Sequence, residues 1–234
     1  MEENRKNDHC KKCGTCCRKG GPSFHHGDRE LIDTGKIPSK YLYTIRKGEL
    51  ARDNVKGMLA PVKKDIIKIK GKGTTWTCIF LDEKANHCTI YKNRPLECRE
   101  LKCWDTTGIE HIYNRKRLTR NDLLSGIEGL WELIETHEEK CSYRKIKELL
   151  KQYPKTHDSR FQEEMLELIS YDASIRNLVV EKAGVDREMN DFLFGRPLTR
   201  TLIMFDLKLI QKDGKPWLEK KGGRYTNYQE KILS

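Results

Sequence analysis

The chain has 234 residues, of which 36% are hydrophobic, so it can form one large or two small globular domains. Lysine and arginine outnumber aspartate and glutamate by 46 to 35, which gives a formal net charge of +11. The apolar runs are too short to cross a bilayer and the first residues do not resemble a signal peptide, so we expect a cytoplasmic protein with no membrane span.

The basic residues are spread along the chain, which by itself indicates a solvated basic surface. Only "NRKRLTR" at 114–120 forms a local cluster, and no RNP motif or zinc-finger spacing surrounds it. Binding to nucleic acid or to an acidic partner is therefore left open but not favoured.

Four of the nine cysteines fall within eight positions near the N-terminus, where "CKKCGTCC" contains Cys10, Cys13, Cys16 and Cys17. In a reducing compartment, clustered thiols bind metal or take part in redox chemistry more often than they form disulfides. Cysteines also pack well inside protein cores, but four in so short a polar segment do not fit that explanation. This segment therefore predicts a metal site.

Short elements follow up to residue 103. The segment "DRELIDTGKI" predicts a helix that begins at Asp28 and ends at Gly35. Segments rich in β-branched and aromatic residues at 65–71, 74–82 and 87–91 predict a small antiparallel sheet that carries two cysteines.

The segment "RPLECREL" predicts a short helix, because Pro95 suits a first helical position and Glu97 and Glu100 suit the N-terminal turns. This helix would carry Cys98, with Cys103 just beyond its end.

From about residue 114 the pattern becomes helical. Apolar residues recur at helical spacing in two stretches, each of which predicts one amphipathic helix. The first follows Asn121 and Asp122, and the second begins near Asp158 and ends at Gly184. The stripes consist of Leu123, Ile127, Leu130 and Ile134, and of Phe161, Met165, Leu168, Ile175 and Val179. The pair Asp213-Gly214 then predicts a hairpin.

These segments together predict an α+β fold, in which a metal-pinned cysteine-rich region with a small antiparallel sheet packs on a C-terminal helical region. We expect a cysteine-cluster metal-binding region at 1–113, a mainly helical region at 114–220 and a tail at 221–234. The cysteine-rich region is expected to need metal in order to fold.

Eight of the cysteines are candidate metal ligands, enough for two sets of four. Four thiolates suit either a tetrahedral structural zinc ion or an iron–sulfur cluster, with one or two clusters of the 4Fe-4S type favoured here. Zinc sites tend to take ligand pairs from two knuckles, whereas three thiols spaced two residues apart are typical of bacterial ferredoxins. The candidates are Cys10, Cys13, Cys16, Cys17, Cys78, Cys88, Cys98 and Cys103.

The adjacent pair Cys16 and Cys17 departs from the ferredoxin run, because no spacer separates the two cysteines and no proline follows. Neighbouring side chains point in different directions, so a single ion bound by both would strain the backbone. We therefore predict that the pair faces two centres or that one thiol bridges. Three N-terminal thiols would join one downstream thiol at one centre, and the pairing of the others stays open.

Other polar residues give weaker signals. His137 and Cys141 lie four residues apart and could bind an ion together, but packing is favoured for Cys141. The remaining candidates are possible ligands or proton carriers at His9, His25, His26 and His87, hydrogen-bond acceptors at Glu97, Glu100 and Asp105, and cations that would stabilise thiolates at Arg18, Lys19, Arg94 and Arg99. A surface position is favoured for each histidine.

The cysteine pattern resembles the YkgJ-type cysteine-cluster family, a zinc- or iron-chelating domain with a CxxCxxCC signature followed by a C…C-x-I-Y-x-x-R-P-x-x-C-R block. The signature here is "CKKCGTCC", and the resemblance covers about residues 8 to 105. The later block consists of Cys78, Cys88, Thr89, Ile90, Tyr91, Arg94, Pro95, Cys98 and Arg99.

This resemblance implies that the cysteines bind metal or an iron–sulfur cluster. Some relatives are flagellin lysine N-methylases, which leaves open an iron–sulfur oxidoreductase or an S-adenosylmethionine-dependent protein methylase. The residues themselves give a methyl-donor site no support, because the chain shows neither a glycine-rich loop after a strand nor CxxxCxxC spacing.

Three functions remain as predictions. The first is an iron–sulfur protein with redox or transferase activity on an unknown substrate or redox partner. The second is a structural zinc module, in which metal replaces missing core. The third is a metal-stabilised interaction protein that uses its basic surface.

Overall fold

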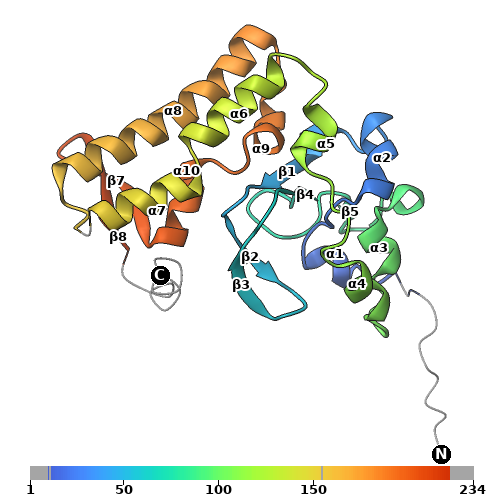
Figure 1. The fold of residues 1–234 in the computed structure, drawn as a ribbon. Helices are drawn as coiled ribbons and strands as arrows, with labels where there is room; N and C mark the ends of the chain where they lie inside the picture. Colours follow the sequence, from blue (N-terminus) through green and yellow to red (C-terminus); the bar gives the residue numbers. More distant parts are fainter. Residues whose placement is uncertain (1–9, 11, 154, 222–234) are drawn as a thin grey trace, which may run out of the picture.

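The computed structural model describes residues 10, 12–153 and 155–221. Figure 1 shows long helices on one side and, on the other, short strands and helices that include the N-terminal cysteine segment. Helices combined with small antiparallel sheets are the α+β class that the sequence predicts. The predicted tail at 221–234 lies outside the described residues apart from Lys221.

The N-terminal half is built from short helical turns and short strands. Its strands pair as antiparallel couples, β1 with β4, β2 with β3 and β5 with β6, so the predicted single sheet is in fact several two-stranded ones. In chain order the elements are α1 (Thr15–Arg18), η1 (His26–Asp28), α2 (Arg29–Asp33), η2 (Ser39–Tyr41), β1 (Leu42–Ile45), β2 (Leu50–Asp53), β3 (Met58–Pro61), β4 (Ile66–Ile69), β5 (Leu81–Asp82), β6 (His87–Cys88), η3 (Tyr91–Asn93), α3 (Leu96–Glu100) and α4 (Thr107–Ile112).

The predicted strand at 74–82 is mostly wrong, because only Leu81 and Asp82 form a strand and Cys78 contributes a single bridge to Gly71. The chain turns instead, since the carbonyl of Lys72 accepts a hydrogen bond from the amide of Thr75 at 2.9 Å. Its β-branched and aromatic residues indicate a half-buried surface, which a turn-rich loop also provides.

The C-terminal half is mainly helical and ends in a hairpin. Its elements are α5 (Arg120–Leu124), α6 (Leu130–Lys140), α7 (Tyr143–Gln152), α8 (Ser159–Ala183), η4 (Arg187–Met189), α9 (Asn190–Leu193), α10 (Leu198–Thr201), η5 (Leu202–Phe205), β7 (Leu207–Lys212) and β8 (Lys215–Lys220). Within the described part of the chain, no helix has both the length and the apolar character needed to cross a bilayer.

Helix α8 and the hairpin confirm their predictions. The carboxylate of Asp158 accepts the amide hydrogen of Arg160 at 2.9 Å, and Gly184 ends the helix in the left-handed conformation. Asp213 and Gly214 have φ values of 51° and 73°, as a tight two-residue hairpin turn requires.

The single helix predicted from the stripe at 123–134 is wrong, because the chain forms α5 and α6 with a turn between them. Gly129 at the N-cap of α6 has φ 74°, which a continuous right-handed helix cannot contain. Ile127 is 49% exposed in the intervening turn, so one member of the stripe does not belong to the core.

Two hydrophobic clusters form the core. One packs α7, α8, α10 and the β7–β8 hairpin around Tyr143 and Phe161. The other joins the two halves of the chain, because Phe24 and Ile67 from the N-terminal half pack with Ile134 and Phe192 from the helical half. The cysteine-bearing elements are therefore anchored on the same core as the long helices.

Gly21 is packed so closely against β4 that a side chain does not fit. A Cβ at this position would lie 2.3 Å from the carbonyl oxygen of Ile69. We expect Gly21→Ala to lower the free energy of unfolding by about 1–3 kcal/mol, because the strand must move to relieve the overlap. Gly27→Ala is the matched control, since a Cβ there meets no atom within 4 Å, and chemical denaturation of both variants measures the difference.

Candidate metal centre

Helix α1 presents Cys16 and Cys17 to the rest of the N-terminal half. Gly14 precedes this helix with φ 73°, and a Cβ there would lie 2.7 Å from Oδ1 of Asn86. The carbonyl of Cys17 accepts a hydrogen bond from the amide of Cys78 at 2.7 Å. This backbone contact holds the adjacent cysteines beside a cysteine some sixty residues further along the chain.

The β5–β6 hairpin carries Cys88, which pairs with Leu81 across the two strands. The Asp82 carboxylate forms the turn by accepting the amide hydrogens of the two residues at 84 and 85. Arg18 from α1 then holds the hairpin, since its guanidinium donates to Oδ1 of Asn86 at 2.8 Å and to the carbonyl of Cys13 at 3.0 Å. The first cysteine segment and the hairpin are thus tied by one arginine.

Cys98 lies on α3, where the sequence places it, and Cys103 lies beyond the helix. The helix is fixed by Asp28, which is fully buried and accepts the amide hydrogen of Leu96 at 2.8 Å. Arg99 lies 3.6 Å from the same carboxylate. Arg99 therefore pairs with Asp28. That Arg99 stabilises a thiolate stays a prediction.

Electrostatic interactions between separate segments of the chain link five cysteines, and we call them the five-thiol group. The thiol of Cys17 donates a hydrogen bond to Cys16, which lowers the pKa of Cys16 to about 6 and raises the pKa of Cys17. The charges of Cys78 and Cys88 also act on Cys17, and those of Cys78, Cys16 and Cys88 act on Cys98. The group is Cys16, Cys17, Cys78, Cys88 and Cys98.

The adjacent pair thus lies within one group. The prediction that Cys16 and Cys17 face two centres assumes that their side chains point apart, yet each of these thiols shifts the pKa of the other. The number of centres that the pair serves stays a prediction.

Burial makes ionisation of the inner thiols unfavourable. It raises the pKa of Cys78, of Cys88 and, most strongly, of Cys98, where the neighbouring thiols add to the effect. Two cations oppose this effect of burial. Arg94 lowers the pKa of Cys88, and Lys72 lowers the pKa of Cys78. The sequence indicates Arg94 as such a cation but gives no signal for Lys72.

The other predicted ligands lie outside the five-thiol group. Cys10, Cys13 and Cys103 are exposed, and Cys13 approaches the hydroxyl of Thr15 at 3.2 Å while its charge acts on Cys16. Over residues 10, 12–153 and 155–221, no three His, Cys, Asp or Glu side chains are arranged to hold a single metal ion. Five of the eight candidate thiols thus belong to the five-thiol group, and Cys10, Cys13 and Cys103 do not.

Glu97 on α3 belongs to a buried polar network. The Glu97 carboxylate accepts the amide hydrogen of Ser23 at 2.6 Å and lies 3.4 Å from Nε2 of His25 and 3.6 Å from Arg117. His25 is 2% exposed, so a surface position is wrong for this histidine. The charge of Lys68 also acts on Glu97 and Cys98. The sequence does not predict this role for Lys68, because it depends on how distant segments of the chain pack.

The remaining candidates have other roles or positions. His137 and Cys141 are fully buried in the helical half, where Nε2 of His137 lies 2.8 Å from Asp172 and the thiol of Cys141 faces the carbonyl of Leu168. His87 is exposed, and His9 lies outside the described residues. The Asp105 carboxylate accepts the amide hydrogen at 107, which is a local turn contact.

The five-thiol group takes its cysteines from four places in the chain, namely α1, the loop before β5, β6 and α3. Residues 9–123 match the CxxCxxCC family, described as a "putative zinc- or iron-chelating domain". Through these residues, about half of its length, the chain belongs to that family. Comparisons with curated proteins and with solved structures gave no significant match.

The donor set fits the metals of that description. Thiolates are the preferred ligands of zinc and of iron–sulfur clusters, and five of them are available here on α1, the loop before β5, β6 and α3. A bound metal would also remove the cost of ionising the buried thiols, because ligand thiolates bind metal in place of their protons.

Proposed function

We propose that the five-thiol group binds an iron–sulfur cluster that transfers single electrons. The observation that carries this proposal is that the adjacent residues Cys16 and Cys17 both belong to the five-thiol group, where a single zinc ion would have to be bound by both or leave one of them unused. A cluster offers several irons, so Cys16 and Cys17 can serve different metal atoms without the strain that one shared ion would impose.

The charge around the group supports the same proposal. A cluster held by thiolates is negatively charged, and the charges of Arg94, Lys72 and Lys68 act on cysteines of this group. The side chain of Cys16 is exposed while Cys78 is 6% exposed, so the group extends from the interior to the surface. Electrons could then enter or leave at the Cys16 edge.

Reversible reduction tests this function. Protein purified without oxygen is treated with dithionite, which donates one electron to the cluster with no bond made or broken in the chain. We expect the visible absorption to bleach, a paramagnetic signal to arise, and both changes to reverse on reoxidation. A colourless protein that contains zinc and shows neither change would contradict electron transfer and support a structural zinc site.

The matched control is the pair Cys88→Ser and Cys141→Ser. Cys88 belongs to the five-thiol group, whereas Cys141 is buried among apolar side chains of the helical half. We expect the redox response to be lost in the first variant and kept in the second.

A further inference from the structure

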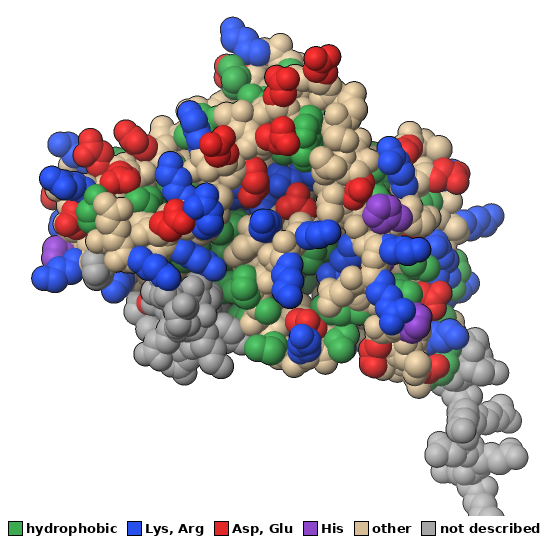
Figure 2. Space-filling model, in the orientation of Figure 1, with side chains coloured by type: hydrophobic (Ala, Val, Ile, Leu, Met, Phe, Trp, Pro, Cys, Tyr) green, Lys and Arg blue, Asp and Glu red, His purple; other side chains and the backbone are tan. Residues whose placement is uncertain are grey.

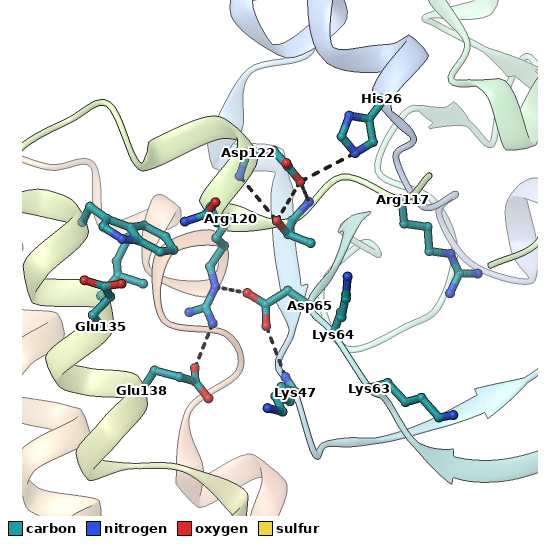
Figure 3. A pocket seen from close by; sticks show the side chains of 14 residues that line it. His26, Lys47, Lys63, Lys64, Asp65, Arg117, Arg120, Asp122, Glu135 and Glu138 are labelled. Carbon is teal, nitrogen blue, oxygen red and sulfur yellow. Dashed lines mark hydrogen bonds and ion pairs between the residues drawn. The ribbon is translucent and has the colours of Figure 1, made fainter. Parts of the chain in front are cut away.

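A cleft of about 610 Å³ opens between the N-terminal strands and helix α6, away from the cysteines (Figure 3). Lysines from two turns line one side, and carboxylates of α6 line the other. Its volume lies within the range of about 300 to 1,000 Å³ typical of small-molecule sites, and it lies where the two halves of the chain meet, as such sites often do.

The lysines are held together by the backbone. Lys47 lies in the turn after β1, and Lys63 and Lys64 lie between β3 and β4. The two segments are hydrogen-bonded to each other, because the amide of Gly48 donates to the carbonyl of Val62 at 2.8 Å. The backbone therefore brings three lysines to the lining of one cleft.

The carboxylates of the cleft, at Asp65, Asp122, Glu135 and Glu138, leave these lysines without an ion pair among the described residues. Arg120, which also lines the cleft, is paired with Asp65 at 2.6 Å and with Glu138 at 2.8 Å. Within the part of the chain that the structure describes, none of the ammonium groups of the three exposed lysines has a carboxylate partner. Figure 2 shows Lys and Arg side chains gathered near the centre of this face, where strands and helices meet.

The opposite side offers acceptors and an aromatic ring. Glu135 on α6 is exposed and lines the cleft without an ion-pair partner among the described residues, and Trp131 one turn earlier is half-buried in the same wall. A carboxylate accepts hydrogen bonds from hydroxyl or amino groups, and an indole packs against the apolar face of a ring.

We propose that this cleft binds a small phosphorylated molecule with hydroxyl groups, such as a sugar phosphate. The phosphate lies among Lys47, Lys63 and Lys64, and the hydroxyls donate to Glu135 beside Trp131. A phosphate suits this wall better than a carboxylate, because three separate ammonium groups act as point charges on three oxygens, whereas a planar carboxylate is matched by the fork of an arginine.

Calorimetric titration with two probes tests the proposal. Ribose 5-phosphate carries both phosphate and hydroxyls, and inorganic pyrophosphate carries phosphate alone. We expect both to bind wild-type protein saturably and the double variant Lys63→Ala/Lys64→Ala to bind each about 10-fold more weakly or worse, since charge-assisted hydrogen bonds are lost. Glu135→Gln should weaken ribose 5-phosphate but not pyrophosphate.

The control variant Lys145→Ala/Lys182→Ala removes the same charge from two exposed lysines outside the cleft and should leave both affinities within about twofold. Absence of saturable binding of either probe to wild-type protein would overturn the proposal. So would equal weakening by the control variant, or binding of succinate as tight as that of ribose 5-phosphate.

Discussion

Cys98→Ser is expected to lose most of its bound metal and to unfold at a temperature about 10 °C or more below wild type. Burial and neighbouring thiols both raise the pKa of Cys98, and a bound metal would remove the cost of ionising this thiol because it replaces the proton. Metal binding contributes about 10 to 16 kcal/mol in zinc-finger peptides, and each 1 kcal/mol shifts the melting temperature of a chain this size by about 2–4 °C. Metal analysis and calorimetry of the same preparation measure both effects.

Two further serine variants control this result. Cys141→Ser alters a fully buried thiol of the helical core, so some stability is lost while metal content stays at the wild-type value. Cys103→Ser alters an exposed thiol outside the five-thiol group and should change neither quantity. Unchanged metal content in Cys98→Ser would remove Cys98 from the ligands, and loss of metal in Cys103→Ser would add Cys103 to them.

Asp172→Asn is expected to lower the free energy of unfolding by about 3–5 kcal/mol. The Asp172 carboxylate is 2% exposed and accepts hydrogen bonds from His137 at 2.8 Å, from Arg176 at 3.0 Å and from the amide of Leu198 at 2.9 Å. An asparagine leaves Arg176 without its buried counter-charge and places an amide hydrogen where a donor already points.

Asp158→Asn removes the same charge from the start of α8 and is the matched control. Asparagine and aspartate are equally good N-cap residues, so this variant should unfold within about 0.5 kcal/mol of wild type in urea titrations. An equal loss in both variants would mean that charge, and not the buried network, accounts for the effect.

The same network predicts how stability depends on pH. Burial lowers the pKa of His137 below about 6.5, so the unfolded chain binds that proton more readily and stability falls as the pH drops below that value. Burial alone would raise the pKa of Asp172, but hydrogen bonds from His137 and the charge of Arg176 outweigh it and lower this pKa from 3.8 to about 2.

Asp172 therefore stabilises the fold above pH 4 and loses this contribution as the pH falls through 2, which corresponds to about 2 kcal/mol. The difference in unfolding free energy between wild type and Asp172→Asn should shrink by that amount between pH 5 and 2. A difference that stays constant over this range would contradict the lowered pKa.

Local sequence signals predict the elements whose ends are set by single residues. Asp158 and Gly184 define α8, Asp213 and Gly214 define the final hairpin, and Pro95 indicates the helix of Cys98. In each case the conformation follows from a cap or a turn that the residue itself makes. These predictions do not depend on the rest of the chain.

Contacts between distant segments could not be predicted in this way. Arg46 is fully buried because its guanidinium bonds to the carbonyl of Cys141 and stacks on Tyr143, and no local pattern shows either partner. Lys68 lies near Cys98 for the same reason. The spacing of cysteines identifies the metal-binding segment, but the selection of five thiols from eight depends on how α1, the hairpin and α3 pack.

The measurement that tests the central proposal most directly is the content of iron, zinc and acid-labile sulfide in protein purified without oxygen, with an absorption spectrum of the same sample. We predict a brown protein in which iron and sulfide are present in equal amounts and zinc is absent. A colourless protein with one or two zinc ions per chain and no sulfide would contradict the iron–sulfur proposal and make the five thiols ligands of structural zinc.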